Sequence, residues 1–215
     1  MLAVMQVIAI DGPAGSGKST VARALAERLG LEYLDTGAMY RAVTFAALRH
    51  GLDPADQAPV AELARRIDIS IGEEVVVDGV DASIEIRGPA VTSAVSLVAN
   101  NPEVRTELVS RQREWANLRK GGVLEGRDIG TVVFPDAAAK VYLSARPEVR
   151  AQRRAKEVTD LDYETVAADL VRRDTLDSGR EHDPLREADD AVHVDTSDLS
   201  VAEIVDQIVA MLEQR

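Results

Sequence analysis

The sequence of 215 residues contains no cysteine. This absence excludes disulfides, thiolate metal sites and cysteine nucleophiles. Aromatic residues make up only 3% of the chain, so aliphatic side chains must form its core. Positive charge is also scarce, because 25 lysines and arginines stand against 37 aspartates and glutamates, for a net charge of −12. Such a protein repels nucleic acid and anionic membranes, but it can still bind a small anion where basic side chains converge.

Long apolar runs are absent as well. No segment approaches the roughly 18 uncharged apolar residues of a membrane helix. The apolar start, Met1–Ile10, lacks the basic region and the small-residue cleavage site of a signal peptide. With 46% hydrophobic and 29% charged residues, the composition is that of a globular domain. We therefore expect a cytoplasmic protein that binds neither membrane nor nucleic acid.

The N-terminal region begins with a strand pattern followed by a helix pattern. Val4–Ile10 is a β-branched apolar run, typical of a parallel strand buried on both faces. Val21, Leu25 and Leu29 then recur at every fourth residue, which predicts one face of a helix. Gly30 follows where a C-cap belongs.

A second strand and helix follow directly. Leu31–Leu34 is a strand candidate, and Asp35 or Thr36 is placed to cap a helix running to about His50, before Gly51. Strand, helix, strand, helix is the start of a doubly wound α/β fold with a parallel sheet.

The pattern changes in the next segment. Isoleucines at 67, 69 and 71 alternate with polar residues, and Val75–Val77 is followed by Asp78-Gly79 and Val80. Alternation with an Asp-Gly turn indicates an antiparallel hairpin, which does not belong in a parallel core. We therefore expect residues 53–100 to form a subdomain inserted into a single domain spanning 1–215.

The remaining segments return to the α/β pattern. Asn101-Pro102-Glu103 is a helix start, and an apolar stripe is expected to follow. Residues 146–180 read as an arginine-rich helical hairpin that we expect to act as a lid. A capping box at Ser200–Glu203 opens a closing helix. The expected stripe is Val104, Leu108, Trp115 and Leu118, and the further strand candidates are Val123–Glu125, Lys140–Leu143 and Val192–Val194.

The loop after the first strand carries the strongest chemical signal. It satisfies G-x-x-x-x-G-K-[ST] between a predicted strand and a predicted helix, the context a phosphate-binding loop requires. Its backbone N–H groups and the helix N-terminus can bind phosphate oxygens. Lys18 can reach the outer phosphates of ATP, and the Ser19 hydroxyl can face Mg²⁺. The predicted ATP contacts are Gly12, Pro13, Ala14, Gly15, Ser16, Gly17, Lys18, Ser19 and Thr20.

Four further motifs have no role in a generic ATPase. They are DTGAMYR at 35–41, S-x-x-x-x-N-P-x-V-R at 96–105, EGRDIGTVVFPDA at 125–137 and RRDxxDSxR at 172–180. In this order and at these spacings the set resembles the bacterial cytidylate kinases, nucleoside monophosphate kinases with an enlarged monophosphate-binding subdomain. The resemblance extends from about Val4 to the last helix.

The resemblance implies a role for each matching position. The side chains that hold the monophosphate would be Arg41, Arg127 and Arg180. Those that read the cytosine would be Ser96, Arg105 and Asp128, and those that contact the ribose would be Arg173 and Asp177. Asp35 and Thr36 would also lie in the substrate site, and Lys18, Arg127 and Arg180 would be the catalytic cations.

Two positions depart from the family pattern, and the lid leaves alternatives open. Thr36 stands where serine is frequent, and Glu125 stands where aspartate is also common. In the lid, Arg150 and Arg154 are candidates for contacting ATP, with Arg146 and Arg153 as possible substitutes, because neighbours on a helix can exchange roles.

The resulting hypothesis is ATP + (d)CMP → ADP + (d)CDP, with Mg²⁺ as cofactor and a monomeric enzyme. A nucleotide phosphate is already largely dianionic near pH 7, so its attack needs no general base. Two rival hypotheses remain: a kinase for another nucleotide or small metabolite, and a regulatory module that binds ATP without transfer. A panel of acceptors distinguishes the three.

Overall fold

The computed structural model describes residues 6–157 and 162–213. Two parts of the sequence predictions lie outside these residues: Val4 and Met5 of the predicted first strand, and 158–161 of the predicted lid.

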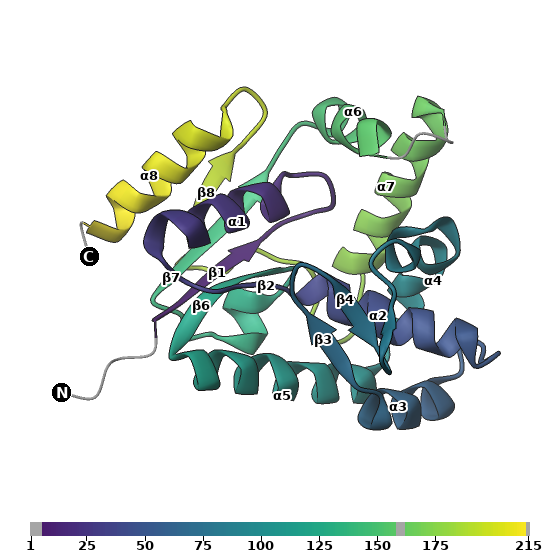
Figure 1. Cartoon of the computed structure of the whole chain (residues 1–215). Coiled ribbons are helices and arrows are strands. Elements are labelled where there is room, and N and C mark those ends of the chain that lie inside the picture. The colour runs from purple at the N-terminus through teal and green to yellow at the C-terminus, as the bar shows by residue number, and fades with distance from the viewer. Residues whose placement is uncertain (1–5, 158–161, 214–215) are drawn as a thin grey trace. The chain divides into compact units, whose positions relative to one another are not determined.

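Five strands form the main sheet, in the order β2-β6-β1-β7-β8. β1 pairs in parallel with both β6 and β7, and β7 pairs in parallel with β8 (Figure 1). β2 and β6 lie on one side of β1, and β7 and β8 lie on the other, so β1 is a topological switch point. In open α/β sheets, ligands bind beyond the carboxyl ends of the strands at such a point. The strands are β1 (Gln6–Asp11), β2 (Tyr33–Asp35), β6 (Gly121–Gly126), β7 (Ala139–Ser144) and β8 (Val192–Asp195).

Contacts divide the chain into two compact units, and the first unit, Met1–Tyr33 with Ala116–Arg215, holds most of the main sheet. Its core contains Ile8, Leu143 and Ile208, none of which is exposed. Each such side chain contributes about 1.5–3 kcal/mol by leaving water. The helical elements of this unit are α1 (Lys18–Leu29), a π-helical turn η2 (Ile129–Val133), α6 (Pro147–Glu157), α7 (Tyr163–Ser178) and α8 (Val201–Glu213).

The second unit, Leu34–Trp115, contains the predicted antiparallel sheet. β4 pairs antiparallel with β3 and with β5, and the turn between β4 and β5 has positive φ at Asp78 (49°) and Gly79 (74°). This is the turn that Asp-Gly favours. The predicted insert, 53–100, falls inside this unit, and its boundaries stay a prediction. The elements are α2 (Thr36–Arg49), α3 (Gln57–Arg66), β3 (Ile69–Ile71), β4 (Val75–Val77), β5 (Val80–Asp81), η1 (Glu85–Arg87), α4 (Pro89–Ala99) and the start of α5 (Pro102–Arg119).

Most predicted helix ends are confirmed. Gly30 ends α1 with φ 65°, and its N–H donates to the carbonyls of Ala26 and Glu27. Asp35 is the N-cap of α2 and accepts from the N–H of Ala38. The Asn101 side chain accepts from the first turn of α5, and the Ser200–Glu203 capping box forms before α8. Local side-chain chemistry therefore sets these boundaries.

Two sequence predictions were wrong in detail. The second strand starts at Tyr33, two residues later than predicted. On α5, Leu118 is 75% exposed and Trp115 is only partly buried. The buried stripe instead continues at a four-residue spacing through a glutamine and an alanine that the prediction did not include. The buried residues at this spacing are Val104, Leu108, Gln112 and Ala116.

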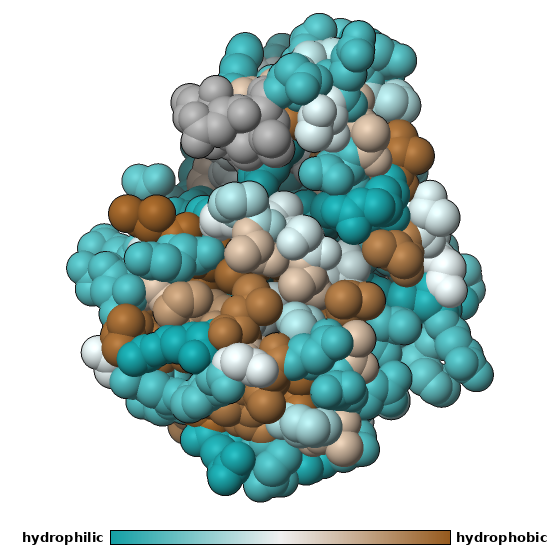
Figure 2. Space-filling model, turned by 90° about the vertical axis from the view of Figure 1, so that its right-hand side faces the viewer, coloured by the Kyte–Doolittle hydropathy of each residue, from teal (hydrophilic) through white to brown (hydrophobic). Residues whose placement is uncertain are grey.

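The surface mixes polar and apolar side chains. On the face shown in Figure 2, brown apolar residues lie among teal hydrophilic ones. Ile84 is the most exposed large apolar side chain of the described residues, at 83%. Over the same residues, no helix has the length and apolar character needed to cross a membrane.

Candidate active site

The phosphate loop joins the end of β1 to α1. Gly12 has φ 147°, and a Cβ at this position would lie 2.1 Å from the Leu143 carbonyl oxygen, so a larger residue would push the loop away from β7. Gly17, the N-cap of α1, has φ 89°, which side-chain-bearing residues rarely adopt. Both glycines of the motif are therefore required by the backbone path.

Three carbonyls of this loop accept hydrogen bonds from side chains. The Lys18 Nζ donates to the Pro13 oxygen (2.7 Å), Arg150 donates to Ala14 (3.0 Å), and the Thr196 hydroxyl donates to Ser16 (2.9 Å). With carbonyls turned toward protein donors, the amide N–H groups of the loop are suited to face an anion.

Lys18 is buried, at 6% exposure. Its pKa is lowered to about 7, first by burial and then by the charge of Arg127, against the opposing effect of Glu125 and Asp11. A buried ammonium gains from an opposite charge within a few ångströms. A phosphate bound in this loop would therefore restore the charged form of Lys18.

A hydroxyl and a carboxylate lie side by side at the start of α1. The Ser19 Oγ donates to Glu125 Oε2 at 3.0 Å, and the Tyr33 hydroxyl donates to the other oxygen of Glu125. Magnesium prefers oxygen ligands and is commonly held by one or two protein groups together with phosphates and water. No cluster of three or more His, Cys, Asp or Glu side chains suited to a metal occurs among the described residues. The Ser19–Glu125 pair thus fits a cation that arrives with a nucleotide.

A second basic cluster surrounds the Asp177 carboxylate near the end of α7. Arg127 donates to Asp177 at 2.8 Å, and Arg180 forms an ion pair with the same carboxylate. Burial acts to lower the pKa of Arg127, but the charges of Asp177, Asp174 and Glu125 outweigh it and the pKa is raised. Burial acts to raise the pKa of Asp177, but Arg127 and Arg180 outweigh it and that pKa is lowered.

Arg173 adds a third guanidinium to this cluster. Its pKa is lowered to about 10, first by burial and then by repulsion from Arg127. Its Nε is buried and has no hydrogen-bond partner among the described residues. Buried donors normally have partners, so this Nε has hydrogen-bonding capacity that the described residues leave unused. The cluster of Arg127, Arg173 and Arg180 carries more positive charge than Asp177 neutralises.

Asp128 and Arg127 belong to the segment that leaves β6. Asp128, at 6% exposure, precedes the π-helical turn Ile129–Val133. Such turns are rare and occur frequently at functional sites. The turn is held by Asp11, whose two oxygens accept from the N–H groups of Ile129 and Gly130, both at 2.8 Å.

The second unit carries the other predicted substrate residues. Arg41 donates to the Ile86 carbonyl (2.7 Å) and to the Thr92 hydroxyl (2.9 Å), so contacts within this unit orient its guanidinium. Arg105 is only 2% exposed, and its guanidinium lies 5.9 Å from the centre of the Tyr40 ring.

Three further predicted residues also lie in this unit. Ser96 is 9% exposed and Thr36 is 3% exposed. Asp35 forms an ion pair with Arg87 at 3.5 Å besides capping α2. Buried Ser96 and Arg105 can make specific polar contacts, whereas an exposed pair would mostly bind water.

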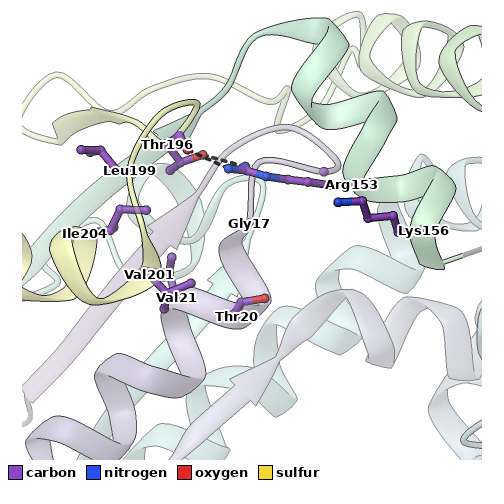
Figure 3. Close-up of a pocket in the computed structure, with 10 residues that line it drawn as sticks. Gly17, Thr20, Val21, Arg153, Lys156, Thr196, Leu199, Val201 and Ile204 are labelled. Atoms are coloured by element: carbon purple, nitrogen blue, oxygen red, sulfur yellow. Dashed lines mark hydrogen bonds between the residues drawn. The ribbon is translucent and has the colours of Figure 1, made fainter.

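A pocket of about 300 Å³ lies beside the phosphate loop (Figure 3). Arg153 and Lys156 of α6 reach into it, and Arg153 donates to both the hydroxyl (2.9 Å) and the carbonyl (2.7 Å) of Thr196. Apolar side chains form the opposite wall, so the pocket suits a flat, partly apolar group attached to phosphates. The remaining lining residues are Gly15, Gly17, Thr20, Val21, Leu199, Val201 and Ile204.

The lid arginines occupy different positions. Arg150 is 7% exposed and, besides its bond to Ala14, forms an ion pair with Asp174 at 2.6 Å. Arg146 is exposed and pairs with Asp198. Arg153 lines the pocket, and Arg154 is partly buried. The assignment of Arg150 and Arg154 to ATP stays a prediction.

Three residues of the site went unnoticed in the sequence. Asp11 had a detectable signal, because an acidic residue that ends a buried strand needs partners. Tyr33 lay within a predicted strand and gave no sign that its hydroxyl reaches Glu125. Thr196 lies 180 residues from the carbonyl it binds, and no local pattern marks it.

Comparison with known proteins gives matches over nearly the whole chain. A family model described as cytidylate kinase matches residues 8–214. A cytidylate kinase of Mycolicibacterium paratuberculosis is 52% identical over 219 residues, covering 97% of this chain and 96% of that protein. A cytidylate kinase of Bacillus subtilis is 46% identical over 218 residues, covering 97% and 96%. The solved structure of a gluconokinase from Sinorhizobium meliloti aligns with a TM-score of 0.51 at 16% identity, covering 98% of this chain and 93% of the other, which bears on the fold alone.

Proposed function

The chain belongs to the cytidylate kinase family, and from that premise we propose how its side chains divide the work of phosphoryl transfer. As a nucleoside monophosphate kinase it transfers the γ-phosphoryl group of ATP to CMP or dCMP, giving ADP and CDP or dCDP. One observation carries the proposal. A phosphate loop with a buried Lys18 and a basic cluster at Arg127, Arg173 and Arg180 occur in the same compact unit, so donor and acceptor phosphates each have cationic partners.

The donor half of the site is the loop Gly12–Thr20. Its amides and Lys18 bind the phosphates of ATP, and Arg150 and Arg154 of the lid complete the contacts. Ser19 and Glu125 would hold Mg²⁺, which supplies charge neutralisation for the β- and γ-phosphates when bound. The bond between Ser19 and Glu125 supports this assignment, because it places two oxygen ligands together.

The acceptor phosphate is held by arginines. Arg41, Arg127 and Arg180 bind the monophosphate, since a guanidinium fork matches the oxygens of a phosphate. Arg173 and Asp177 contact the ribose, and the Arg173 Nε has a donor that no described residue uses. Asp35 and Thr36 belong to the same substrate site, where Asp35 fixes the start of the helix that carries Arg41.

Ser96, Arg105 and Asp128 read the cytosine. The exocyclic amine of cytosine donates, so the Asp128 carboxylate can accept from it, while the ring N3 and O2 accept from a hydroxyl and a guanidinium. Uracil presents a carbonyl in place of the amine, which would face the carboxylate. A buried mismatch of this kind costs about 1–3 kcal/mol, or roughly ten- to hundredfold in kcat/KM.

No general base is required for the transfer. The acceptor phosphate is already largely dianionic near pH 7 because its second pKa is about 6. The protein therefore aligns the two phosphates and neutralises the charge between them, with Lys18, Arg127 and Arg180 as the cations nearest the transferred group. The lid excludes water and so limits hydrolysis of ATP.

An acceptor panel tests the function and its base specificity together. ADP release is measured with CMP, dCMP, UMP, AMP and GMP, and the two cytidylates should be used far faster than the others. Asp128→Ala should lower the CMP-to-UMP ratio of kcat/KM about tenfold or more while leaving basal ATP hydrolysis unchanged. Asp136→Ala, an exposed aspartate of the same segment, is the matched control. An equal rate with AMP would contradict the specificity, and equal losses in transfer and hydrolysis would remove the role of Asp128.

Three further properties belong to the proposal. We expect Mg²⁺ dependence, a monomer in solution and a cytoplasmic location. The paired oxygens of Ser19 and Glu125 support the first, and the net charge of −12 disfavours binding to nucleic acid or anionic membranes.

A further inference from the structure

Asp11 occupies a position between two parts of the site that have separate roles. It ends β1 directly before Gly12 of the phosphate loop, and it is 5% exposed. Its two carboxylate oxygens accept from two consecutive amides, those of Ile129 and Gly130, each at 2.8 Å. No role in binding ATP or the acceptor falls to this side chain in the proposal above.

The two amides belong to the start of the π-helical turn that follows Arg127 and Asp128. The Asp11 carboxylate therefore anchors the backbone directly after Arg127 and Asp128, the residues assigned to the acceptor. The turn is tightly packed at Gly130, because a Cβ there would lie 3.4 Å from the Asp11 oxygen and 3.1 Å from the Lys140 side chain. A shift of this turn would move Arg127 and Asp128 relative to the phosphate loop.

We propose that Asp11 is a positioning residue that holds the Arg127–Asp128 segment at a fixed position relative to the phosphate loop, so that the acceptor phosphate is aligned with the γ-phosphate of the donor. This inference rests on the proposed roles of Arg127 and Asp128, and it adds to them the side chain that ties the acceptor segment to the donor loop. Two charge-assisted hydrogen bonds from one carboxylate fix both position and orientation of a backbone segment.

The two hydrogen bonds to the turn require an ionised Asp11 carboxylate. An ionised Asp11 accepts from both amides, whereas a protonated one presents an O–H where an acceptor is needed. The pKa of Asp11 is raised to about 6, first by burial, against the opposing effect of the Gly130 and Ile129 amides; Asp128 raises it and Lys18 lowers it. The pKa of Tyr142 is raised, first by burial, and the Asp11 charge also raises it. Near pH 7 and above, the carboxylate is ionised and both bonds form.

Asp11→Asn tests the proposal, because an amide keeps the shape but offers one acceptor and one donor. The donor faces a backbone N–H, so one buried amide loses its partner. We expect kcat/KM for CMP to fall about ten- to hundredfold and the preference for CMP over UMP to shrink, while the affinity for a non-hydrolysable ATP analogue changes by less than about threefold. Asp53→Asn is the matched control, since Asp53 accepts from the Ala55 amide on an exposed loop of the second unit.

A second variant and a spectroscopic measurement make the test independent of folding and of activity. Gly130→Ala adds a Cβ between the Lys140 side chain and the Asp11 carboxylate, which displaces the same turn and should produce the same pattern of losses. In ¹⁵N-resolved NMR spectra of the wild-type chain, the amide resonances of Ile129 and Gly130 should titrate with a midpoint near pH 6, and this titration should vanish in Asp11→Asn.

Unchanged CMP kinetics in both folded variants would overturn the proposal. Equal losses of CMP use and ATP-analogue binding would overturn it as well, because equal losses would indicate a general structural role. Amide resonances that do not respond to Asp11 would overturn it as well. A wild-type chain that fails to phosphorylate CMP would contradict the proposed function instead, and the NMR titration would still decide whether Asp11 holds the turn.

Discussion

Replacing Lys18 with methionine should stabilise the fold while it abolishes phosphoryl transfer. Methionine keeps an unbranched side chain one atom shorter than that of lysine, but it removes the buried ammonium, whose pKa is lowered from the ordinary value of 10.5 to about 7, chiefly by burial. At 1.36 kcal/mol for each pH unit, this difference corresponds to about 5 kcal/mol of unfavourable free energy in the folded state. The hydrogen bond from Lys18 to Pro13 is lost in return, at about 1 kcal/mol, which leaves a net gain of a few kcal/mol.

The pH dependence fixes the sign of this effect. Between pH 7 and 10.5 the unfolded chain binds more protons at Lys18 than the folded chain does, so the stability of the wild type rises with pH across this window. The advantage of Lys18→Met should therefore be largest below pH 7 and should disappear as pH approaches 10.5. Urea unfolding of both proteins at pH 6.5 and pH 9.5, without nucleotide, measures it.

Two results would refute this reasoning. One is a variant that is less stable than the wild type at pH 6.5, which would show that Lys18 is not under electrostatic strain without ligand. The other is a stability difference that does not change with pH. A stabilised variant that still transfers phosphate would contradict the catalytic role of Lys18 instead.

Two further substitutions test the packing of the phosphate loop. Gly12→Ala places a Cβ 2.1 Å from the Leu143 carbonyl oxygen and should abolish binding of an ATP analogue in calorimetry; Gly30→Ala, also at positive φ but with nothing within 4 Å of the added Cβ, should bind normally. Arg150→Met removes a donor to Ala14 and leaves Asp174 without its ion pair, so it should lower the free energy of unfolding by about 2 kcal/mol in urea and weaken ATP binding. Arg146→Met, which breaks an exposed ion pair, should cost less than about 1 kcal/mol, and similar losses in the two variants would contradict the structural role of Arg150.

Much of the fold was predictable because short-range chemistry determines it. The caps at Gly30, Asp35 and Ser200 satisfy terminal backbone groups within a few residues, and the Asp78-Gly79 turn depends on φ values that few residue pairs adopt. In each case the residues that form the cap or the turn lie within four or five positions of one another. The boundaries that depend on them are therefore where the sequence placed them.

The failures occur where burial depends on distant neighbours. The stripe of α5 includes Gln112 and omits Leu118, a choice that hydrophobicity alone cannot make. In the site, the motif predicted the loop and Lys18, but the carboxylate of Asp11 finds its partners 118 and 119 residues away. The roles assigned to Arg41, Arg105 and Asp128 came from a resemblance and remain predictions about a bound ligand.

The contacts that shape the phosphate loop also bear on the order in which the chain folds. The carbonyls of Ala14 and Ser16 are held by Arg150 and Thr196, side chains 136 and 180 residues farther along. Contacts of such long sequence separation form late, because closing large loops is entropically costly. A chain emerging from the ribosome thus carries the complete nucleotide-binding motif long before it can hold that motif in shape. We therefore expect a nascent chain to bind ATP well only after β8 and Thr196, the residue that follows it, have been synthesised.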